Sequence, residues 1–200
     1  MSTDLTFRIL LLILFVGFVA HRGYYSHKYT PTEDTTLKKR ESHWVAKLAN
    51  LLSLPALIAT FLYIFVPGWM AWGSWPLPIW LRWGGVGIAL LGFALLQWSH
   101  WTLAKNWSDQ PRLIKKQALV MTGPYRWIRH PIYTAFLLIL GSTFFLSANW
   151  FMGTFWLAAI GLEIMSRIQF EEAMLAEHFG EPYRTYTRQT GRLLPRLFHP

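Results

Sequence analysis

Long apolar runs separated by short polar segments are the dominant pattern of this chain of 200 residues. The runs cover about residues 5–22, 44–66, 79–103, 131–147 and 150–168. Each has roughly the 17–25 residues that a transmembrane helix needs. The pattern therefore predicts an all-α integral membrane protein with five transmembrane helices, in which residues 1–200 form a single membrane domain.

The first polar segment, His21 to Ser42, is expected to be a loop. The run before it is interpreted as a membrane helix rather than a signal peptide, because bulky Phe18 stands where cleavage before His21 would require a small residue. Tyr24 and Tyr25 would lie at the membrane interface. Further along the chain, Pro55 predicts a kink in the second helix.

Small residues in the third apolar run, at Gly84, Gly85, Gly87 and Gly92, indicate close packing against another membrane helix. A close approach of a cofactor to Gly85 and Gly87 is the weaker alternative. No G-x-G-x-x-G pattern follows a strand, so a dinucleotide-binding fingerprint is absent.

The positions of the basic residues predict the orientation in the membrane. Residues 21–43, residues 105–131 and the C-terminal tail contain nearly all Lys and Arg, whereas residues 67–78 and 147–150 contain none. The positive-inside rule then places the N-terminus outside and the C-terminus in the cytoplasm, in the plasma or inner membrane if the host is prokaryotic.

Composition excludes several classes of function. The formal net charge of +9 could suggest nucleic acid as a partner, but the basic residues lie between apolar runs rather than on a soluble basic face. We therefore expect no nucleic-acid partner. The chain has no cysteine, which excludes disulfides, thiolate chemistry and cysteine-bound metals, and no metal site is predicted.

The segment Gly123 to Tyr133 combines two prolines, two arginines, a histidine and two tyrosines directly before an apolar run. Gly123 followed by Pro124 predicts a turn. Pro131 restricts His130 to an extended conformation and suits the first turn of the next helix. A shaped polar loop at a helix N-terminus is typical of a site for a charged small molecule.

The fifth apolar run carries ionisable residues at helical spacing. Glu163, Arg167 and Glu171 are four residues apart and share one face of a helix. Ionisable groups at membrane depth are functional candidates by default. The alternative is a structural ion pair between Glu163 and Arg167, with Glu171 already in the interface. The helix is expected to continue to Phe179, with Gly180 as its C-cap, and the basic tail would lie on the membrane surface.

Three motifs in the second half of the chain together resemble the isoprenylcysteine carboxyl methyltransferase family. They are Gly123-Pro-Tyr-x-x-x-Arg-His-Pro-x-Tyr133, Arg167-x-x-x-Glu171-Glu172 and Phe179-Gly180-x-x-Tyr183. The likeness is closest to small five-helix prokaryotic members and extends, more distantly, to membrane phospholipid N-methyltransferases. It covers about Asn106 to Pro195, whereas the N-terminal half is similar only in hydropathy.

The resemblance implies S-adenosylmethionine as methyl donor, in a cytoplasmic pocket formed by a catalytic core of residues 105–200. Arg167 falls where the family has an arginine on the substrate side, and Gln117 stands where the best-known members have histidine. The implied cofactor contacts are Gln110, Gln117, Ala118, Leu119, Val120, Tyr125, His130, Pro131, Ile132, Tyr133 and Glu171.

The chemistry of these side chains agrees with that donor. Glu171 and Glu172 can pair with its sulfonium and ammonium groups, while His130 and backbone N–H groups can hold its carboxylate. Tyr125 and Tyr133 can face the adenine or the sulfonium. Arg167 could hold a carboxylate acceptor through two hydrogen bonds, so Arg167 and Glu171 are the expected catalytic residues.

Three functions remain open from the sequence. The leading one is carboxyl O-methylation of an isoprenylcysteine-like or other lipophilic carboxylate that enters from the membrane. The second is N-methylation of a phospholipid amine, which requires a base such as Glu171, Glu172 or His130. The third is a membrane scaffold or transporter without enzymatic activity, which would leave the clustering of His130, Arg167 and Glu171 unexplained.

Overall fold

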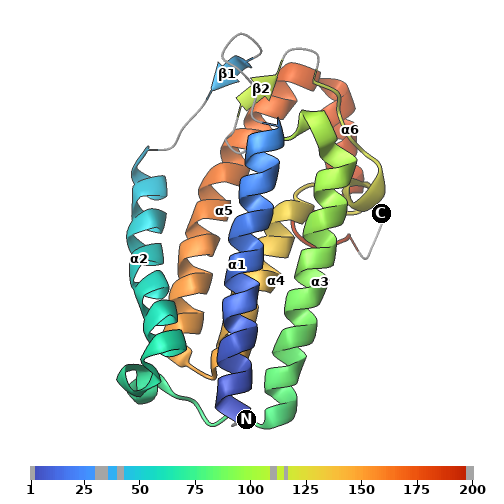
Figure 1. Cartoon of the computed structure of the whole chain (residues 1–200). Coiled ribbons are helices and arrows are strands. Elements are labelled where there is room, and N and C mark those ends of the chain that lie inside the picture. The colour runs from blue at the N-terminus through green and yellow to red at the C-terminus, as the bar shows by residue number, and fades with distance from the viewer. Residues whose placement is uncertain (1–2, 30–35, 40–42, 109–111, 115–116, 197–200) are drawn as a thin grey trace.

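Five long helices alternate in direction in the part of the chain that the computed structural model describes, which comprises residues 3–29, 36–39, 43–108, 112–114 and 117–196 (Figure 1). The first begins at one end of the bundle, and the two short strands lie at the opposite end. The helices are α1 (Thr3–Tyr29), α2 (His43–Phe65), α3 (Ile79–Leu103), α4 (Pro131–Ser147) and α5 (Trp150–Phe179).

Four helices of the described chain, α1, α2, α3 and α5, are long and apolar enough to cross a membrane. The fifth, α4, is apolar but shorter, with 17 residues. The all-helical membrane architecture is thus confirmed, and five complete spans remain a prediction. Pro55 lies inside α2, which continues through it without a break, and the kink also remains a prediction.

The predicted loop from His21 is wrong for its first third, because α1 continues to Tyr29. Contacts with α3 explain the extension. His21 Nε2 lies 3.0 Å from Gln97 Oε1, and Gln97 Nε2 donates to the Tyr25 hydroxyl at 2.7 Å. Tyr25 is therefore buried against α3 rather than placed at the interface, whereas Tyr24 is exposed.

Helices α3 and α4 pack closely at two glycines. A Cβ atom on Gly85 would lie 2.4 Å from Phe145 Cβ, and one on Gly92 would lie 2.7 Å from Ile139 Cγ1. The predicted packing role is confirmed for these two positions. Gly87 meets nothing within 4 Å and faces away from this contact.

A polar cluster closes the end of the bundle where α1 begins. Asn149 caps α5 by accepting from Met152 N at 3.2 Å, and its Nδ2 donates to Met70 O in the 3-10 helix η2 (Pro67–Gly73) at 2.9 Å. Arg82 at the start of α3 donates to Leu146 O at 2.9 Å. These side chains satisfy backbone groups that helix ends leave without partners.

The opposite end of the bundle contains short elements that the sequence did not predict. The strands β1 (Thr36–Lys39) and β2 (Arg112–Ile114) pair antiparallel, with Thr36 opposite Ile114 and Lys39 opposite Arg112. They join the two polar segments that follow α1 and α3 (Figure 1). The 3-10 helices η3 (Ala104–Asn106) and η4 (Gly123–Arg126) lie on either side of β2 in the sequence.

The C-terminal tail packs on the protein, and its predicted position on the membrane surface stays a prediction. Helix α6 (Glu181–Gln189) buries Tyr183 and Tyr186. Beyond it, Gly191 O accepts from Arg129 N at 2.8 Å, and Arg192 O accepts from His130 N at 3.0 Å. The tail thereby fixes the backbone of the loop that precedes α4.

Candidate active site

A cavity lies at the bundle end where α3 and α5 finish and α4 begins. Helices α1, α4, α5 and α6 contribute to its wall, together with residues 103, 106–108 and 117–120. Its volume of about 160 Å³ is roughly ten times the space that one water molecule requires. The cavity is therefore large enough for part of an organic ligand. Most of the cofactor contacts implied by the sequence line it: Gln117, Ala118, Leu119, Val120, Tyr125, His130, Ile132, Tyr133 and Glu171.

Two of the predicted contacts are not in the cavity wall, and a third cannot be placed. Pro131 is buried as the first residue of α4, and Glu172 faces an ion-pair cluster beside the cavity. Gln110 lies outside the described residues. The segment 117–120 is held in place by Asn106, whose Oδ1 accepts from Ala118 N at 2.9 Å.

The loop before α4 has its shape because of Gly123. This residue adopts a φ of +56°, and a Cβ there would lie 2.6 Å from Thr102 Oγ1 on α3. Only glycine fits both the positive φ and this close approach. The turn leads into η4, where Tyr125 O accepts from the Tyr186 hydroxyl at 2.6 Å. Helix α6 thus supports the loop from behind.

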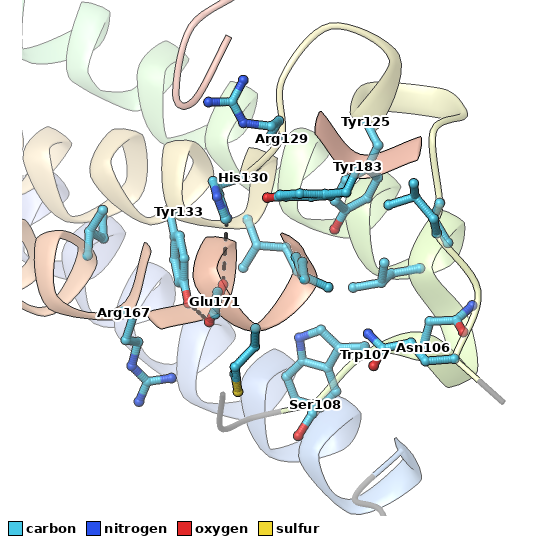
Figure 2. Close-up of a pocket in the computed structure, with 18 of the residues that line it drawn as sticks. Asn106, Trp107, Ser108, Tyr125, Arg129, His130, Tyr133, Arg167, Glu171 and Tyr183 are labelled. Atoms are coloured by element: carbon cyan, nitrogen blue, oxygen red, sulfur yellow. Dashed lines mark hydrogen bonds and ion pairs between the residues drawn. The ribbon is translucent and has the colours of Figure 1, made fainter. Parts of the chain in front are cut away.

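The carboxylate of Glu171 is the main acidic group in the wall. The Tyr133 hydroxyl donates to its Oε1, and His130 Nδ1 lies 3.6 Å from its Oε2 (Figure 2). The rings of His130 and Tyr133 stack at a centroid distance of 5.6 Å. Asn106 and Trp107 lie across the cavity in Figure 2. A half-buried carboxylate in this position suits a cationic ligand group.

Glu172, the next residue of α5, stabilises the loop rather than lining the cavity. Its Oε1 lies 2.9 Å from Arg129 Nε, and its Oε2 lies 2.8 Å from Arg192 NH2. His130 Nε2 approaches Oε1 at 3.4 Å, which is a contact longer than a normal hydrogen bond. Burial lowers the pKa of His130, but the carboxylates of Glu171 and Glu172 raise it, and the net shift of the pKa is upward.

The Tyr183 hydroxyl is buried in the cavity wall and has no hydrogen-bond partner among the described residues. Burial raises the pKa of Tyr183, so the group is a neutral donor and acceptor at physiological pH. A buried hydroxyl without a partner is costly unless a ligand or water pairs with it. Burial also raises the pKa of Tyr125, so its hydroxyl is neutral as well.

The predicted ion pair on α5 is present and belongs to the same cavity. Arg167 NH2 lies 3.0 Å from Glu163 Oε1, and both side chains line the wall. The two interpretations from the sequence, an ion pair and a functional site, are therefore compatible. The pair lies one to two helical turns from Glu171 along α5.

Several lining residues were missed by the sequence analysis. Arg22 was assigned to a loop, and Asn106, Trp107 and Phe136 carry no motif that marks them. Tyr183 and Tyr186 belong to the family-like motif region, but they were expected on the membrane surface. Their spacing of three residues on a short helix was the available signal, because it places both rings on one face.

Comparison with known proteins agrees with this geometry. The model of the isoprenylcysteine carboxyl methyltransferase (ICMT) family matches residues 85–177. A methanethiol S-methyltransferase from Pseudomonas sp. is 31% identical over 156 residues, which cover 74% of this chain and 58% of that protein. A protein-S-isoprenylcysteine O-methyltransferase from Tribolium castaneum is 30% identical over 119 residues, covering 58% of this chain and 44% of that protein.

A solved structure shares the fold. The eukaryotic intramembrane Ras methyltransferase ICMT aligns with a TM-score of 0.58 and 24% identity, over 78% of this chain and 54% of that chain. This chain spans about half the length of these relatives, between 44% and 58%. Together with the apolar helices, the matches show that the chain is an integral membrane protein and a member of the isoprenylcysteine carboxyl methyltransferase family.

Proposed function

We propose that this protein is a membrane methyltransferase that uses S-adenosylmethionine and acts on an anionic acceptor. The observation that carries the proposal is that one cavity contains the Glu171 carboxylate at one part of its wall and the Arg167 guanidinium at another. The first suits a cationic donor and the second an anionic acceptor. A scaffold or transporter would not require a carboxylate and a guanidinium in one cavity wall.

The residues present fit the donor. Glu171 offers a carboxylate for an ammonium or sulfonium group. The hydroxyl of Tyr183 has no hydrogen-bond partner among the described residues, and a bound ligand could provide one. Trp107 and the segment 117–120 provide an aromatic and backbone wall for a purine. When bound, S-adenosylmethionine supplies an electrophilic methyl group on a positively charged sulfur. The chain then has to exclude water and align the acceptor.

A small thiol, reacting as its thiolate, is the acceptor that the geometry supports best. Glu163 already pairs with Arg167. The carboxylate of an acceptor would therefore have to displace Glu163 before it could accept two hydrogen bonds from the guanidinium. A thiol instead needs a base for its proton, and Glu163 is a carboxylate in the wall beside the arginine. The forming S–C bond replaces the bond from the donor's sulfonium. The name of the Pseudomonas relative supports this acceptor class.

A lipophilic carboxylate is the second candidate, supported by the planar guanidinium in an apolar wall and by the name of the Tribolium relative. A carboxylate is ionised at neutral pH and needs no base. A phospholipid amine fits less well, because Arg167 would oppose the positive charge that develops on nitrogen.

The test uses transfer of a labelled methyl group to ethanethiol and to N-acetyl-S-farnesylcysteine. Glu163→Gln should reduce turnover of the thiol while leaving the carboxylate nearly unaffected. Arg167→Lys keeps the charge but loses the planar fork, so turnover should fall about tenfold or more with donor affinity unchanged. Arg184→Lys, on an exposed part of α6, is the matched control.

Two results would contradict this proposal. One is wild-type protein that transfers methyl to neither probe. The other is near-normal turnover in Arg167→Lys with intact folding, which would reduce Arg167 to a structural partner of Glu163 and remove the preference for an anionic acceptor.

A further inference from the structure

Besides Arg129 and Arg167, a third arginine lines the same cavity from a helix that the family model does not cover. Arg22 lies in the last third of α1, is partly buried, and belongs to the cavity wall. Its guanidinium carbon stands 5.6 Å from the ring centroid of Phe136 on α4. A cation over an aromatic face is held there but keeps most of its hydrogen-bonding capacity.

Arg22 differs from the other inward-facing arginines in lacking an oxygen partner. Within the described parts of the chain, its guanidinium contacts the Phe136 ring and has no hydrogen bond or ion pair with a carboxylate or carbonyl oxygen. Arg8 donates to Ile64 O at 2.8 Å, and Arg129 pairs with Glu172 at 2.9 Å. Five N–H donors in an apolar region are costly unless an acceptor satisfies them.

Arg22 adds an unbalanced positive charge to the cavity wall. Elsewhere in the same wall, Arg167 and Glu163 form a neutral pair at 3.0 Å. Arg22 adds one cation, so the three groups together carry a charge of +1. With Glu171 assigned to the donor and Arg129 paired with Glu172, the remaining charge of the wall matches a ligand group with a single negative charge rather than a neutral one or a dianion.

The neighbours of Arg22 place it on the acceptor side of the cavity. Phe136 is one helical turn deeper along α4 than Tyr133, which contacts Glu171. Ile160 and Ile164, both buried, line the wall one and two turns before Arg167 on α5. Arg22 thus contacts an aromatic ring of the apolar part of the wall, whereas Tyr133 contacts the carboxylate that we assign to the donor.

We propose that Arg22 binds the anionic group of the methyl acceptor, so that α1 contributes substrate specificity to this enzyme. The inference rests on the proposed function and deepens it. The preferred substrate has an apolar body, held by Phe136, Ile160 and Ile164, and one negative charge shared between Arg22 and Arg167. A thiolate and a monocarboxylate both satisfy this description, and the acceptor assays distinguish them.

The test compares Arg22→Gln and Arg22→Lys with wild type, using whichever of ethanethiol and N-acetyl-S-farnesylcysteine the wild type methylates. Arg22→Gln should raise the KM for that acceptor about tenfold or more, as expected for loss of a charged hydrogen bond. Its kcat should change less, its affinity for S-adenosylhomocysteine should stay within about twofold of wild type, and Arg22→Lys should recover part of the loss.

The matched control is Lys28→Gln, which removes the same charge from the same helix. Lys28 is exposed and bonded to Tyr24, outside the cavity. An unchanged KM in Arg22→Gln would overturn the inference, and so would an equal KM increase in Lys28→Gln. A large loss of S-adenosylhomocysteine affinity would overturn it as well, by moving Arg22 to the donor. Wild-type protein that methylates neither probe would overturn the proposed function too.

Discussion

At the scale of single residues, two adjacent glutamates have separate tasks. Glu171 faces the cavity and Tyr133, whereas Glu172 pairs with Arg129 and Arg192 behind it. Neighbouring residues of a helix point about 100° apart, which follows from 3.6 residues per turn. The sequence analysis assigned both glutamates to the cofactor, because the sequence does not show on which side of the helix the cavity lies.

Replacement of Glu171 tests the donor site. Glu171→Gln should weaken binding of S-adenosylhomocysteine by about 1.5–3 kcal/mol, because it removes a carboxylate paired with a partly desolvated cation. Calorimetry on purified protein measures the change. Glu181→Gln, on the exposed start of α6, is the control and should bind normally. Unchanged affinity in Glu171→Gln would remove this residue from the site.

His130 gives a prediction about pH. Its pKa is raised above the ordinary value of 6.5 by the two carboxylates, after burial has lowered it. The protonated form is therefore stabilised on folding, and this contribution is fully present below pH 6.5 and lost as the pH rises through the raised pKa. Thermal unfolding between about pH 5.5 and 8.5 should show wild type losing more stability than His130→Gln. Parallel curves would contradict the prediction.

At the scale of elements, the sequence located the apolar helices well and the polar elements poorly. The bounds of α3 and α4 agree with prediction. Prolines mark where both helices begin, since α3 follows Pro78 and α4 starts at Pro131, and α4 ends at Ser147. The final turns of α1, the two strands and α6 depend on contacts between distant segments, such as Tyr25 with Gln97. Local pattern does not contain that information.

The α3–α4 contact can be tested with two glycines of one helix. Gly92→Ala places a Cβ within 2.7 Å of Ile139 Cγ1 and 3.1 Å of its backbone N, so it should cost about 1–3 kcal/mol of stability through overpacking. Gly87→Ala meets nothing within 4 Å and should be neutral or stabilising by up to about 1 kcal/mol. Thermal unfolding in detergent distinguishes them. Equal effects at both sites would contradict the packing described for this helix pair.

At the scale of the whole molecule, the alternating helices bring the loop before α4, the end of α5 and α6 to one end of the bundle. The family resemblance implied a pocket formed by residues 105–200, but it did not predict that α6 packs against the loop before α4. It could not predict that α1 completes the wall, because Arg22 stands in a segment whose polar composition is typical of a loop. The shape of the acceptor side thus depends on the N-terminal half, where the family resemblance is weakest.

The orientation of the bundle is a separate prediction at this scale. Reporters fused after Arg40, after Lys116 and at Pro200 should all give a cytoplasmic signal, because the basic residues concentrate on that side. A reporter near Trp72, in the segment without Lys or Arg, should give an external signal. A cytoplasmic signal at Trp72 would contradict five spans, because α2 and α3, which flank this segment, would then not cross the membrane.

The most direct test of the central claim is binding of S-adenosylhomocysteine to purified wild-type protein, measured by calorimetry beside a Glu171→Gln, Tyr183→Phe double variant. We predict saturable binding at one site per chain in the wild type, and a large loss of affinity in the variant with its fold intact by circular dichroism. Absence of binding to folded wild type, or equal binding by both proteins, would contradict the assignment of this cavity to the methyl donor.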